Sequence, residues 1–74
     1  MSEDLYVWAR RLHDKLGIPI MILFQHSTVF IGVPEEGEYT IVFNKEIEEV
    51  KEEELTECKL IEIYVPTLQI LCLG

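Results

Sequence analysis

Basic residues are scarce in this chain of 74 residues, which has six Lys and Arg against fourteen Asp and Glu. The formal net charge of −8 repels nucleic-acid phosphates and anionic lipid head groups, so neither is an easy partner. No charged residue occurs between positions 16 and 34, but Gly17, Pro19 and the polar residues 25–28 interrupt this stretch. Because a membrane-spanning helix needs about 20 predominantly apolar residues, we expect no membrane association.

Cysteine is also rare. Cys58 and Cys72 are the only two, and the acidic start of the chain has no signal-peptide pattern. This combination predicts a reducing, cytoplasmic location in which both are buried thiols. His13 and His26 do not form the paired spacings of a zinc site with them, so we expect no metal and no cofactor.

A catalytic constellation is missing as well. The acidic residues are clustered, so they repel one another and stay solvated, and no nucleophile has a recognisable base nearby. His26 and Ser27 are neighbours on a predicted tight turn, where adjacent side chains rarely face each other. We therefore predict no catalytic residues and no enzymatic activity.

The chain is short, and it forms a single domain over residues 1–74 on this reading. A domain of this size buries only about 60 to 65% of its unfolded surface, and natural examples usually add disulfides, a metal or partner subunits. Residues 18–24 are apolar at nearly every position, which requires cover on both faces of a strand. With neither a disulfide nor a metal expected, the pattern predicts a homo-oligomer.

Apolar residues recur at helical spacing between Leu5 and Leu16. Ser2 is suited to be the N-cap, and Gly17 followed by Pro19 ends the pattern, which predicts a helix over residues 3–16. The chain then becomes rich in β-branched and aromatic residues. Gly32 indicates a bend or bulge of the kind that curls a sheet into a barrel. Strands are expected over residues 18–25, 28–33, 38–43, 60–65 and 68–73.

Residues 45–59 permit two interpretations. Their Glu and Lys content favours a second helix over 45–58, with Ile47, Val50, Leu55 and Cys58 on one face, which gives an α+β domain. The alternative is a charged strand over 46–51 followed by one helical turn at 52–55, which gives a mostly β domain. Local propensity favours the helix, whereas the order of the surrounding strands favours the strand.

The order of these features resembles the Sm-like family, and within it bacterial Hfq. The resemblance is carried by the helix at 5–16, Ile18-Pro19-Ile20, Gly32, and the segments 39–43, 50–55 and 61–66. It covers about residues 3–66. It implies an SH3-like, strongly bent five-stranded antiparallel barrel over residues 18–66, with the helix on its open end and an extra C-terminal strand at 68–73.

Sm-like proteins assemble as rings in which the fourth strand of one copy pairs with the fifth strand of the next. The resemblance therefore implies a ring of about five to seven copies, in which exposed strand edges are hidden by neighbours. The candidate interface residues are Val50, Ile61, Ile63 and Val65.

The usual ligand of the family is single-stranded RNA. The positions that match its two RNA-binding motifs include Tyr39, Thr40 and Lys51, and Tyr39 is suited to stack on a base. The first motif lies on a loop that is about three residues shorter than in the family, and three Glu residues follow Lys51. These departures predict weak or selective RNA binding, aided by the helix residues Arg10, Arg11 and Lys15.

Two other functions fit the same residues. An acidic homo-oligomeric scaffold or protein-interaction module would bind no nucleic acid and would turn residues 46–57 toward a basic protein partner. If residues 45–58 form a helix, the chain is instead a small α+β binding protein.

Overall fold

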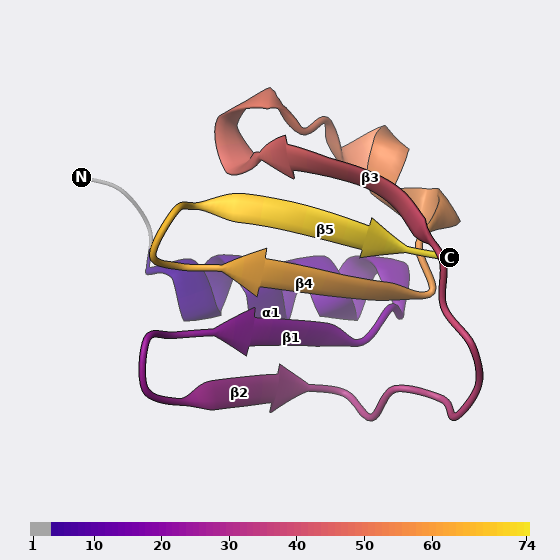
Figure 1. The fold of residues 1–74 in the computed structure, drawn as a ribbon, viewed down its shortest axis with the longest axis horizontal. Coiled ribbons are helices and arrows are strands. Elements are labelled where there is room, and N and C mark those ends of the chain that lie inside the picture. Colours follow the sequence, from indigo (N-terminus) through magenta and orange to yellow (C-terminus); the bar gives the residue numbers. More distant parts are fainter. Residues whose placement is uncertain (1–3) are drawn as a thin grey trace.

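One helix and five strands form the computed structural model, which describes residues 4–74 (Figure 1). The chain is a small α+β domain in which the helix covers one face of a mixed sheet. Two short 3-10 turns, η1 and η2, join the third strand to the fourth. The elements are α1 (Leu5–Leu16), β1 (Ile20–Leu23), β2 (Thr28–Ile31), β3 (Ile41–Glu46), η1 (Ile47–Glu49), η2 (Glu52–Glu57), β4 (Leu60–Tyr64) and β5 (Gln69–Leu73).

The strands follow the order β2-β1-β4-β5-β3. Neighbours are antiparallel except β1 and β4, which run parallel. The edge strands β2 and β3 do not pair with each other, so the sheet is open. The expected antiparallel barrel is therefore wrong on both counts, since the sheet neither closes nor keeps one strand sense, whereas the N-terminal helix is confirmed.

The helix α1 ends where the sequence predicts. Gly17 adopts the left-handed conformation, with φ 72°, and its N–H donates to the carbonyl of His13 at 2.7 Å. At the other end, the Asp4 carboxylate caps the helix by accepting from the N–H of Tyr6 at 2.8 Å. Ser2, the predicted N-cap, lies outside the described residues. The buried Ala9 and Leu12 pack onto the sheet.

Of the three inner strands, β1 and β5 are apolar at nearly every position, whereas β4 carries Glu62 on the side away from α1. Ile20, Ile22, Ile61, Ile63 and Ile70 are fully buried, and the register places them on one face of the sheet. The C-terminal strand is thus no extra element. The C-terminal strand was expected at the periphery, but β5 lies between β4 and β3 and belongs to the centre of the sheet.

Residues 45–58 match neither sequence interpretation in full. The segment expected as a charged strand at 46–51 includes the end of β3 and the turn η1, and the expected second α-helix is replaced by 3-10 turns. The position beside β4 that the charged strand would need is filled by β5. The short helical turn expected at 52–55 corresponds to η2, from which Leu55 enters the core.

Cys58 and Cys72 form a disulfide, with their Cα atoms 5.4 Å apart. Both are buried as expected, but the prediction of free thiols is wrong. The bridge joins the end of η2 to β5, and it is at odds with the reducing compartment that the sequence suggested. No helix within residues 4–74 has the length and apolar character needed to cross a membrane.

Candidate functional site

The sheet has one face that no element covers. In Figure 1, α1 lies behind β1 and β4, and within residues 4–74 no helix or turn crosses the near side. Side chains alternate along a strand, so the neighbours of the buried isoleucines point to this side. The register places Phe30, Met21, Glu62, Leu71 and Asn44 in one row across the sheet. We call this surface the open face.

The next row of the open face consists of Thr28, Leu23, Tyr64, Gln69 and Glu46. Together the two rows gather five large apolar or aromatic side chains. Of these, Phe30 is 56% exposed and Tyr64 is 46% exposed. Exposed apolar side chains that gather on one surface mark an interaction site. The five are Met21, Leu23, Phe30, Tyr64 and Leu71.

The open face is not flat. A hollow of about 220 Å³ is lined by residues of β1, β4, β5 and β3, namely Leu23, Tyr64 and Leu71 together with the polar Asn44, Glu62 and Gln69. Phe30, on the edge strand β2, stands on the other side of the same face. The open face therefore carries both a protruding aromatic ring and a depression.

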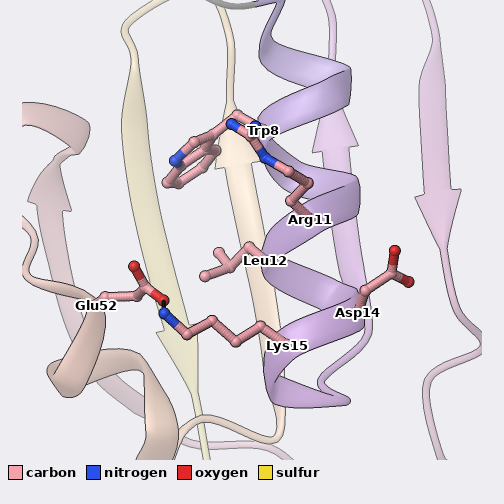
Figure 2. Close-up of a pocket in the computed structure, with 6 residues that line it drawn as sticks. All are labelled: Trp8, Arg11, Leu12, Asp14, Lys15 and Glu52. Atoms are coloured by element: carbon pink, nitrogen blue, oxygen red, sulfur yellow. Dashed lines mark ion pairs between the residues drawn. The ribbon is translucent and has the colours of Figure 1, made fainter.

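A separate cavity of about 510 Å³ lies between α1 and η2 (Figure 2). Trp8, Leu12 and Lys15 line it from the helix, and the Lys15 ammonium binds the Glu52 carboxylate across it at 2.6 Å. The side chain of Arg11 lies beside the Trp8 ring, whereas Asp14 points to the opposite side of α1. The ion pair between Lys15 and Glu52 neutralises one cation and one anion of this cavity.

The candidate RNA-binding residues do not converge. Tyr39 lies in the loop before β3, lines a cavity with Glu35, Glu36 and Glu38, and donates its hydroxyl hydrogen to the Glu35 carbonyl. Thr40 is bound by backbone hydrogen bonds to Gly74, beyond the end of β5. Lys51 is exposed at the start of η2.

Most of the helix cations are engaged by acids. Arg10 forms an ion pair with Asp14 at 3.5 Å, and Lys15 is bound to Glu52 as described above. Arg10, Arg11 and Lys15 all project from α1, which lies behind the sheet, so they share no surface with the open face. Within residues 4–74, these ion pairs offset the positive charge of Arg10 and Lys15 on α1.

The candidate interface residues divide into two groups. Ile61 and Ile63 point toward α1 and have no exposed surface, so they already belong to the core of a single copy. Val50 and Val65 are half-buried at the margin of that core. Only the latter pair has surface to offer a neighbour.

Sequence reasoning missed Phe30, Tyr64 and Trp8 as functional candidates. The apolar character of β1 and β5 on both faces was the available signal, and it was interpreted as a contact between strand edges. Comparison with known proteins finds no matching family model, no matching curated protein and no matching solved structure.

Proposed function

We propose that the chain is a protein-interaction module that self-associates by pairing the open faces of two copies. The observation that carries this proposal is the bare, apolar side of a sheet whose other side is covered by α1 (Figure 1). Sheets pack face to face at a separation of about 10 Å, and each flat apolar surface fills the other. A second copy supplies a surface of matching shape.

The exposed Phe30 and the hollow on the open face support a dimer with two-fold symmetry. A two-fold axis that runs along the strands, between the sheets, places β2 of one copy over β5 and β3 of the other. The protruding Phe30 of each copy then meets the hollow bounded by Leu23, Tyr64 and Leu71 of its partner. Such reciprocal contacts are the signature of an isologous interface.

The size required is modest. A standard interface buries about 800 Å² on each partner, roughly 15% of the 5182 Å² accessible surface of the chain. Five large side chains in two adjacent rows would form the centre of such a contact, because aromatic residues at the middle of an interface supply most of its binding energy.

The charge distribution favours protein over RNA as the partner. Arg10, Lys15 and Lys45 are each bound to an acid of the same chain, and the net charge is −8. An RNA phosphate would have to displace those acids and overcome the surrounding negative charge. Single-stranded RNA binding by a ring of about five to seven copies is therefore the less favoured function.

Sedimentation velocity over a concentration series tests the self-association. We expect wild-type protein to form dimers and Phe30→Ser to raise the dissociation constant at least about tenfold, the effect of losing a central aromatic contact. Val33→Ser is the matched control, because Val33 is 89% exposed but lies in the loop after β2, and it should leave the dimer intact.

A wild-type chain that remains monomeric at roughly 0.1 mM would refute the proposal. If the chain instead binds a labelled RNA at low ionic strength, and if Tyr39→Ala and Lys51→Ala abolish this binding, RNA binding would be the function.

A further inference from the structure

A second exposed apolar surface lies between the start of α1 and the turn η1. This α1/η1 groove has a volume of about 500 Å³, within the range typical of ligand-binding clefts. Trp8 lines both this groove and the cavity of Figure 2. The groove is lined by Leu5, Trp8, Ile47, Glu48, Val50 and Leu68.

Leu68 holds an unusual position at the rim of the groove. It is 49% exposed, and its φ is 54°, the left-handed region that residues other than glycine rarely adopt. Its carbonyl accepts from the N–H of Ile47 at 2.8 Å, which fixes the turn between β4 and β5 against η1. A backbone strained by a positive φ persists where the surrounding structure enforces it, and such residues cluster at binding sites. The large apolar side chain is thus presented to solvent by a fixed backbone.

The charged residue that lines the groove is acidic. Glu48 lines it, and Glu49 is exposed on the same turn. Within residues 4–74 neither carboxylate takes part in an ion pair, whereas Lys15, farther along α1, is bound to Glu52. An occupant with apolar side chains and positive charges would match every element of this surface.

We propose that the α1/η1 groove binds a basic amphipathic helical segment of a partner protein. Its apolar side chains would enter between Trp8, Val50 and Leu68, and its Lys or Arg residues would meet Glu48 and Glu49. An amphipathic helix lying in an apolar groove is a recurrent mode of peptide recognition. A second copy of the chain fits less well here, because its net charge of −8 opposes the acidic rim. The proposal does not depend on pairing through the open face.

Fluorescence titration tests this proposal directly, because Trp8 is the only tryptophan of the chain and lines the groove. The probe is a synthetic amphipathic Leu/Lys peptide of about 14 residues, long enough to form a helix on binding. We expect saturable quenching or a spectral shift of the Trp8 emission. The same peptide with Glu in place of every Lys should cause no change.

Matched variants separate the groove from general charge attraction. Glu48→Gln combined with Glu49→Gln should weaken binding about fivefold, as expected for two exposed charge contacts. Glu35→Gln combined with Glu36→Gln removes the same charge from the cavity near Gly17, at the far end of α1, and should change binding less than about twofold. Leu68→Gly should weaken binding about fivefold by removing apolar contact. Glycine adopts a positive φ without strain, so this variant should keep its fold, as a thermal melt would show.

Amide chemical-shift mapping with the Phe30→Ser variant locates the peptide. Shifts confined to residues 5–8, 47–50 and 68 support the proposal. It is overturned if the Glu35/Glu36 variant loses as much affinity as the Glu48/Glu49 variant. Shifts centred on Leu23, Tyr64 and Leu71 would equally overturn it, since the peptide would then lie on the open face, and so would a peptide that does not bind.

Discussion

Gly32 shows how one residue determines the junction between the helix and the sheet. It follows β2 with φ 79°, and a Cβ atom added there would lie 2.6 Å from the His13 ring. His13 in turn donates from Nδ1 to the carbonyl of Ile18 at 2.8 Å, since a carbonyl oxygen only accepts. The sequence indicated an irregular backbone conformation at Gly32. It could not indicate that the His13 side chain of α1 would pack directly against Gly32.

Substitution of Gly32 by Ala should destabilise the fold by about 1–3 kcal/mol, because alanine adds both an unfavourable φ and a steric clash. Gly17→Ala is the matched control, since its φ is 72° but nothing lies within 4 Å of the added Cβ. It should cost about 1 kcal/mol, the backbone component alone. Urea denaturation of the two variants measures both losses of unfolding free energy. Equal losses would show that the His13 ring moves aside at no cost in stability.

Glu54 links η2 to β3. Its Oε1 accepts from the Lys45 ammonium at 2.8 Å, and its Oε2 accepts from the Lys51 N–H at 3.1 Å. The hydrogen bond from Lys45 is the main cause that lowers the pKa of Glu54 below its ordinary value of 4.5, and the Lys51 N–H adds to it. Because the folded-state pKa is the lower one, the stabilisation is complete above the unfolded value and disappears as the pH falls through the folded value.

Glu54→Gln should therefore be less stable than wild type at pH 7, and the difference should shrink as the pH falls below about 4. Thermal melts of both proteins across this range provide the measurement. Lys45→Met is the partner variant, and it should lose stability at neutral pH with the same pH dependence. A gap between wild type and Glu54→Gln that persists at low pH would show that the lost stability is unrelated to the charge of Glu54.

Among the elements, α1 was the most predictable, because its apolar stripe and Gly17 are local signals. The strands were located approximately, but their order was not. β1 and β5 are apolar on both faces because they are central strands. The sequence indicates that these strands are central, but it does not indicate which strands lie beside them. The segment 46–51 could be interpreted as a charged strand, yet β5 lies beside both β4 and β3 and leaves it no partner. Strand order depends on contacts between distant residues, which local propensity cannot provide.

The disulfide fixes one such distant contact, between the end of η2 and β5. Closing a loop of about 15 residues stabilises a protein by roughly 3 kcal/mol in the chain-entropy model. We therefore expect Cys58→Ala combined with Cys72→Ala to lose about 2–4 kcal/mol. Urea denaturation with and without reductant tests this expectation: wild type should lose stability on reduction, and the double variant should be indifferent. A wild type that is insensitive to reductant would contradict it.

At the scale of the whole molecule, the excess of apolar surface could be predicted, whereas its location could not. Ile61 and Ile63 were predicted to contact a neighbour, but α1 already covers them. The surplus instead lies on alternate residues of the same strands, such as Met21, Leu23 and Tyr64. A single sequence shows that a strand needs cover on two faces, and only the position of α1 decides which of them is left bare.

The charge at the centre of the open face gives a further test of self-association. Glu62 lies on β4, the middle strand, where a two-fold axis along the strands would bring the carboxylates of both copies close together. Two like charges that lose water on association oppose it. We therefore expect Glu62→Gln to strengthen the dimer by about three- to tenfold, measured by sedimentation velocity at constant ionic strength. Glu36→Gln changes the net charge equally but lies in the loop between β2 and β3, away from the open face, so its effect should be smaller and should vanish as salt rises. Equal effects of the two variants would mean that only the overall charge matters and that β4 does not lie at the centre of the contact.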